Sequence, residues 1–79
     1  MNKRLAGLLA EIFGLRPSEI TPDLTKDDVG SWDSLKQMEL VVTLEREFSV
    51  TLEIRDIVKM VSVAGIVEVL QANGADLGD

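Results

Sequence analysis

The stretch Gly30-Ser-Trp-Asp-Ser-Leu-Lys-Gln-Met-Glu-Leu40 contains the clearest helix start in the chain. A rigid Trp32 is followed by Asp33 and Ser34, and good helix formers come next. Serine and aspartate are both favoured where a helix begins, because a side-chain oxygen accepts a hydrogen bond from an amide that has no helical partner. The stretch therefore predicts a helix that begins at Ser34, with a small hydroxyl at its front end.

The length of 79 residues, of which 46% are hydrophobic, suits one small domain whose core is made by helix packing. The chain has no cysteine, which excludes disulfides and thiolate zinc sites. Its longest uncharged stretch, residues 60–67, is far too short to cross a bilayer. We therefore expect a soluble, cytoplasmic protein that has no membrane partner.

The net charge of −6 comes from 14 acidic and 8 basic side chains. Such a surface repels the phosphate backbone of nucleic acids, so nucleic acid is not an expected partner. The same field attracts a protein that carries a basic patch, although acidic surfaces also serve to keep small proteins in solution.

Apolar residues at helical spacing and the turn residues between them predict an all-α, four-helix bundle in a single domain, residues 1–79. The expected elements are a helix over about 2–15, a long loop over 16–33, a helix over 34–48, a short helix over about 54–60, a helix over 62–73 and a frayed tail over 75–79. Ile20, Leu24 and Val29 should hold the loop against the helices. The expected core consists of Leu5, Leu8, Ile12, Leu40, Leu44, Phe48, Val63, Ile66 and Leu70.

The helix over 34–48 has more apolar surface than one core contact requires. One side carries Leu40, Val41, Leu44 and Phe48, and an adjacent side carries Leu35, Met38 and Val42. Together they span about 220°, whereas the apolar stripe of an ordinary surface helix spans about 100° or somewhat more. Either the long loop covers the second side, or it is an exposed strip, flanked by Glu39 and Glu45, that a partner protein binds.

Ser34 has a simple structural interpretation and few chemical ones. Ser34 and Gln37 match a capping box, although Asp33 could cap the helix instead. The chain has no histidine or cysteine, and Ser34 and Lys36 point to different sides of a helix, so no catalytic residue is predicted. The spacing of the acidic side chains does not match a calcium loop, and no metal site is predicted for Asp23, Asp27, Asp28 and Asp33.

Three stretches of the chain resemble the acyl carrier protein family in its discrete, type II form: Asp33-Ser34-Leu35, Met38-Glu39-Leu40-Val41 and Leu44-Glu45-Arg46-Glu47-Phe48. The likeness covers nearly the whole chain. The resemblance implies a 4′-phosphopantetheine arm on Ser34, transferred from coenzyme A by a phosphopantetheinyl transferase, on which acyl groups are held as thioesters and shuttled between enzymes. It also implies that Asp33 orients the transferase and its magnesium during loading. The implied partners are acyl-loading and acyl-processing enzymes with basic docking patches, which a monomeric carrier would meet through Leu35, Met38, Glu39, Val42 and Glu45.

Trp32, Lys36 and Arg46 depart from the pattern of carriers in ordinary fatty-acid synthesis, and the Trp-Asp-Ser-Leu form is similar to carriers of specialised pathways, polyketide synthesis among them. We expect Trp32 to close the loop against the core. The core could also shelter part of an acyl chain, as the family implies. Two alternatives stay open: an aminoacyl or peptidyl carrier, and an unmodified helical interaction module in which Ser34 only caps the helix.

Overall fold

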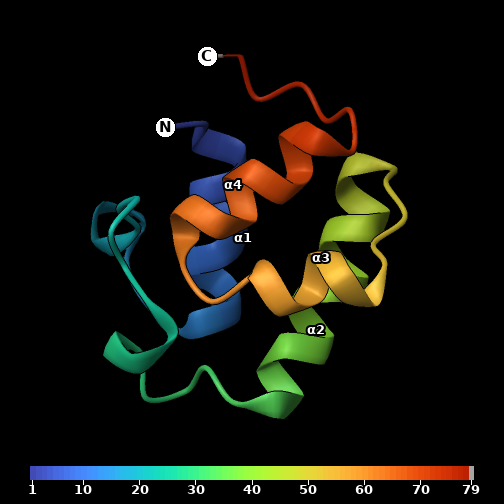
Figure 1. The fold of residues 1–79 in the computed structure, drawn as a ribbon. Coiled ribbons are helices and arrows are strands. Elements are labelled where there is room, and N and C mark those ends of the chain that lie inside the picture. Colours follow the sequence, from blue (N-terminus) through green and yellow to red (C-terminus); the bar gives the residue numbers. More distant parts are fainter. Residues whose placement is uncertain (79) are drawn as a thin grey trace.

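Residues 1–78, which the computed structural model describes, form four α-helices and two short 3₁₀ turns (Figure 1). The elements in chain order are α1 (Lys3–Phe13), η1 (Pro17–Glu19), η2 (Lys26–Asp28), α2 (Ser34–Phe48), α3 (Ile54–Lys59) and α4 (Val63–Ala72). No strand occurs in this described range, and a single isolated bridge joins Thr25 to Ser62. The predicted all-α fold with a short third helix is therefore confirmed.

Local side chains and glycines set the ends of the helices. The Asn2 side chain accepts a hydrogen bond from the Leu5 amide and caps α1, and Gly14 ends this helix in the left-handed conformation with φ 70°.

Residues 75–78 have no regular secondary structure. Leu77 is nevertheless buried in the core, so this tail packs along the bundle, in contrast to the frayed tail expected from the sequence. Asp79 lies outside the described residues.

The core contains most of the residues expected there: Leu5, Ile12, Leu40, Leu44, Val63, Ile66 and Leu70 are buried. Leu8 and Phe48, which the sequence also placed in the core, are only half-buried. Leu9 takes the central position in α1 because Leu5, Leu9 and Ile12 share one side of that helix. Met60, in the connection between α3 and α4, is also fully buried.

Backbone hydrogen bonds hold the long first loop across the start of α4. The Lys26 amide donates to the Val61 carbonyl at 2.8 Å, the Val63 amide to the Leu24 carbonyl at 2.9 Å, and the Ala64 amide to the Pro22 carbonyl at 3.0 Å. Ile20 and Val29 are buried in the core and Leu24 packs against it, so all three residues anchor the loop as predicted. The loop is therefore ordered up to α2, which begins at the end of the molecule opposite the two termini (Figure 1).

Gly65 permits the close packing of α3 on α4, and its replacement by alanine should be costly. A Cβ at this position would overlap the backbone carbonyl oxygen of Lys59. Because backbone must move to make room, we expect Gly65→Ala to lower the free energy of unfolding by about 2 kcal/mol or more in a urea titration.

Gly7→Ala is the matched control. Gly7 also lies within a helix, but an added Cβ there meets no atom within 4 Å. This variant should gain about 0.5–1 kcal/mol, since alanine loses less backbone entropy than glycine on folding. Equal effects of the two substitutions would contradict the close approach of α3 and α4.

Candidate functional site

Ser34 is the first residue of α2, and Asp33 caps the helix. Asp33 Oδ1 accepts a hydrogen bond from the Lys36 amide at 2.9 Å. The Ser34 side chain is exposed, and its hydroxyl makes no hydrogen bond within residues 1–78. The capping box of Ser34 with Gln37 is therefore wrong, because the residue before Ser34 already supplies the oxygen that the amide needs. The hydroxyl at the front end of α2 has no structural task.

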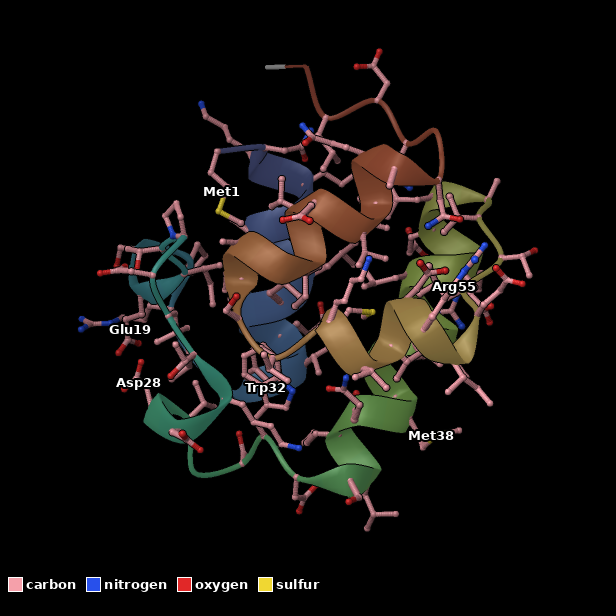
Figure 2. The ribbon with its side chains drawn as sticks, in the orientation of Figure 1. Met1, Glu19, Asp28, Trp32, Met38 and Arg55 are labelled. Atoms are coloured by element: carbon pink, nitrogen blue, oxygen red, sulfur yellow. The ribbon has the colours of Figure 1, made fainter. Side chains whose placement is uncertain are left out.

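Trp32 fixes the chain two residues before this hydroxyl. Its indole is only 3% exposed and stacks on the Phe13 ring, with the ring centroids 4.5 Å apart and an angle of 29° between the planes. The Ser31 hydroxyl donates to the Phe13 carbonyl oxygen at 3.0 Å, which ties the same turn to the end of α1. The prediction that Trp32 closes the loop against the core is confirmed (Figure 2).

Gln37 connects Trp32 to α3. Its Oε1 accepts a hydrogen bond from the Trp32 indole Nε1 at 2.7 Å. Its Nε2 donates to the carbonyl oxygens of Ile57 at 3.3 Å and Met60 at 3.1 Å. The Gln37 side chain thus ties the first turn of α2 to Trp32 on one side and to α3 and Met60 on the other. Both polar atoms of this half-buried side-chain amide have hydrogen-bond partners. Sequence reasoning missed this role because Ile57 and Met60 lie 20 and 23 positions away along the chain.

The second apolar side of α2 is exposed to solvent. Leu35 is 81% exposed, Met38 60% and Val42 53%, whereas Leu40, Val41 and Leu44 on the other side are buried. The long loop does not cover these three residues, since it runs toward α1 and α4. The alternative in which the loop buries this side is therefore wrong. Figure 2 shows Met38 pointing outward from α2, away from the core.

The two acidic residues beside this strip differ in their surroundings. Glu39 is exposed and forms an ion pair with Lys36, with 3.3 Å between Oε1 and Nζ. Glu45 is half-buried, and its Oε2 accepts a hydrogen bond from the Leu52 amide at 2.9 Å. This bond holds the connection between α2 and α3. Glu45 therefore has a structural task that the sequence did not reveal, and its contact with partner proteins stays a prediction.

The acidic side chains of the long loop organise turns. Hydrogen bonds from the backbone amide and then the hydroxyl of Thr25, both at 3.0 Å, lower the pKa of Asp28. The backbone amide of Arg16, which donates to the carboxylate at 2.8 Å, lowers the pKa of Glu19 in the same way.

Within residues 1–78, no group of three or more acidic side chains is arranged to hold a metal ion. No helix in this part of the chain is long and apolar enough to span a membrane.

A groove of about 480 Å³ opens between the start of α1 and α4. It is lined by Met1, Asn2, Leu5, Pro22, Ala64, Val67, Glu68, Gln71 and Leu77. Met1 lies toward the chain termini, whereas Trp32 lies toward the start of α2 (Figure 2). The groove is therefore distant from Ser34.

Comparison with known proteins identifies the family of this chain. The model of the family described as "Phosphopantetheine attachment site" matches residues 3–70. An acyl carrier protein of Exiguobacterium is 41% identical over 64 residues, which are 80% of this chain and 80% of that protein. The chain belongs to the acyl carrier protein family. Carriers of this family hold a covalent 4′-phosphopantetheine, tether acyl intermediates on it, and interact with phosphopantetheinyl transferases and biosynthetic enzymes.

Polyketide synthases also contain a region similar to this carrier. The non-reducing polyketide synthase sor2 of Hypocrea jecorina is 41% identical over 76 residues, which are 96% of this chain. The highly reducing polyketide synthase 2 of Gibberella zeae is 33% identical over 73 residues, or 92% of this chain. The carrier corresponds to only 3% of the length of each synthase. The similarity therefore concerns one carrier region within each large protein.

Proposed function

We propose that Ser34 is the residue to which the phosphopantetheine arm is attached, and that the loaded carrier shuttles acyl intermediates between separate enzymes. The observation that supports this most strongly is the free Ser34 hydroxyl at the start of α2, where Asp33 already supplies the cap. The arm supplies a terminal thiol on which acyl groups are held as thioesters. Its phosphodiester would lie at a helix N-terminus, where unpaired amides and the helix dipole favour an anion.

The neighbouring residues have distinct proposed tasks. Asp33 Oδ1 is occupied by the Lys36 amide, and Oδ2 has no hydrogen bond in residues 1–78, so Oδ2 is available to orient the magnesium of the transferase. Trp32 and Gln37 keep the turn before Ser34 in place while the arm moves. The exposed strip of Leu35, Met38 and Val42 lies directly beside the hydroxyl and would contact each enzyme that visits it.

The carrier itself is proposed to have no catalytic activity, because it lacks histidine and cysteine. The polyketide synthase relatives favour polyketide or related specialised biosynthesis as its pathway. Basic docking patches on its enzymes, a cytoplasmic location, a monomeric state and action as a single carrier domain stay predictions from the sequence.

Incubation of the unmodified carrier with coenzyme A and a broad-specificity phosphopantetheinyl transferase tests the proposal. Intact-mass spectrometry should show that one phosphopantetheine is added to each chain. A carrier denatured before the incubation is the control and should gain nothing, because the transferase recognises the folded start of α2. If the folded protein gains no mass while a known carrier is loaded in the same tube, the proposed function is wrong.

A further inference from the structure

The groove between the start of α1 and α4 has no task in the function proposed above. Its volume of about 480 Å³ falls within the range of ligand-binding sites in proteins. Its floor is apolar, because Leu5 is fully buried and Leu77 is only 9% exposed. Val67, which is half-buried, also lines it. An apolar floor with a few polar groups around it is typical of a binding site.

Two polar side chains that line the groove have unused hydrogen-bonding groups. Asn2 Oδ1 accepts a hydrogen bond from the Leu5 amide at 2.9 Å, but Asn2 Nδ2 makes none within residues 1–78. The Gln71 side chain is exposed and makes no hydrogen bond in the same part of the chain. A primary amide both donates and accepts, so it can pair with the N–H and C=O groups of a peptide backbone. These two side chains therefore suit a peptide better than a plain hydrocarbon chain.

The side-chain charge in the groove is negative. Among the described residues that line it, Glu68 is the only one with a charged side chain. Its carboxylate is exposed and takes part in no ion pair within residues 1–78. By contrast, Glu39 and Glu53 already pair with Lys36 and Arg55. A ligand with a positive group would therefore meet a free carboxylate in the groove.

The position of the groove leaves Ser34 accessible. The first and last segments of the described chain lie at the end of the molecule opposite the start of α2 (Figure 1), and Met1 and Leu77 both line the groove. The synthase relatives are far longer than their carrier region, so their polypeptide continues beyond at least one end of it. A protein segment bound at this end would hold the carrier and leave the arm at the opposite end free to move.

We propose that the groove binds a short segment of a biosynthetic enzyme that offers apolar side chains and one lysine or arginine. The apolar side chains rest on Leu5, Val67 and Leu77, and the basic side chain lies along the same wall with its charged end at Glu68. The segment keeps the carrier beside the enzyme while the arm delivers its cargo. This purpose rests on the arm at Ser34, whereas binding of the segment does not.

Selection from a phage library of short random peptides tests this proposal. The unmodified wild-type carrier is the bait, and the library is first depleted on Gln71→Arg. This substitution lies at an exposed position in the last turn of α4, where a positive charge suits the helix dipole, and one turn from Glu68. The new side chain should pair with Glu68 and fill the groove, so depletion removes peptides that bind elsewhere. The peptides that remain should combine apolar residues with a lysine or arginine.

Fluorescence polarisation with the most enriched peptide measures the contribution of Glu68. Glu68→Gln should weaken binding by about three- to fivefold at low ionic strength, the size expected of one exposed ion pair. Glu11→Gln is the matched control, because it removes one negative charge from an exposed position of α1 outside the groove. Its effect should stay below about twofold, since distant charges are screened. A saturating peptide should leave the rate of loading at Ser34 unchanged, and far-UV circular dichroism should be the same for all variants.

The absence of enriched peptides after depletion overturns the proposal, and so does an enriched set without lysine or arginine. Equal weakening by Glu68→Gln and Glu11→Gln also overturns it, because Glu68 would then act only through the overall charge. A peptide that blocks loading binds beside Ser34 rather than in the groove, which is equally contradictory. A dimer in sedimentation velocity that Gln71→Arg dissociates assigns the groove to self-association and overturns the proposal. Absence of loading without peptide contradicts the proposed function alone and leaves the peptide site intact.

Discussion

Ser34→Ala should abolish loading with phosphopantetheine and leave the stability of the domain unchanged. No other hydroxyl lies at the start of α2, so the transferase has no acceptor in this variant. The Asp33 cap remains, and the Ser34 hydroxyl makes no hydrogen bond within residues 1–78. The free energy of unfolding should therefore stay within about 0.5 kcal/mol of the wild-type value in a urea titration. Intact-mass spectrometry after incubation with coenzyme A and transferase measures the loading.

Ser62→Ala is the matched control, and we expect it to lose stability but to keep its loading with phosphopantetheine. The Ser62 hydroxyl caps α4 by accepting a hydrogen bond from the Gly65 amide at 3.0 Å. Its removal should lower stability by about 1 kcal/mol while loading continues. The two variants together separate a serine that is a cap from a serine that is an attachment point. A loss of stability in Ser34→Ala similar to that in Ser62→Ala would show that both serines are caps.

Trp32→Ala should have the largest effect on stability of any single change considered. The indole is almost fully buried and stacks on Phe13, and truncation of such a side chain costs about 3–5 kcal/mol. A domain of this size is stabilised by only about 4–12 kcal/mol in total, at the usual contribution per residue. The variant should therefore be partly unfolded or have a much lower urea midpoint, measured by far-UV circular dichroism because no other tryptophan is present.

Trp32→Phe tests the hydrogen bond apart from the ring contact. Phenylalanine can still stack on Phe13, but the half-buried Gln37 Oε1 loses the donor that lies at 2.7 Å in the wild type. Leaving such an acceptor without its partner costs about 1–3 kcal/mol. A stability of Trp32→Ala within about 1 kcal/mol of the wild type would contradict the tight packing of the loop before Ser34.

The order and type of the helices, the start of α2 and its second apolar side could be predicted from sequence because each depends on local patterns. Whether the long loop covers that second side stayed open until the structure showed Leu35, Met38 and Val42 to be exposed. Apolar spacing defines a helix and its inner side, and a run of two capping residues marks where it begins. The choice between Asp33 and Ser34 as the cap could not be predicted, since both residue types suit that position. It depends on which side chain reaches the Lys36 amide.

The features that the sequence did not reveal involve contacts between distant segments. The Gln37 amide bonds to residues of α3, the loop backbone bonds to residues 61–64, and Gly65 is needed only because Lys59 approaches it. Exposed Ile54 and Val58 look like core residues in the sequence, because α3 is too short to show a clear apolar period. Tertiary packing, rather than local sequence preference, determines the Gln37 contacts, the path of the loop, the need for Gly65 and the exposure of Ile54 and Val58.

Mapping the modified residue by tandem mass spectrometry is the most direct test of the central claim. The wild-type carrier would be loaded with coenzyme A and a transferase, digested, and searched for peptides that carry phosphopantetheine. The modification should lie on the peptide that contains Ser34, with fragment ions that assign it to that side chain. A modification on Ser31 or another serine of the chain, or none at all, would contradict the claim that the free hydroxyl at the start of α2 is the point of attachment.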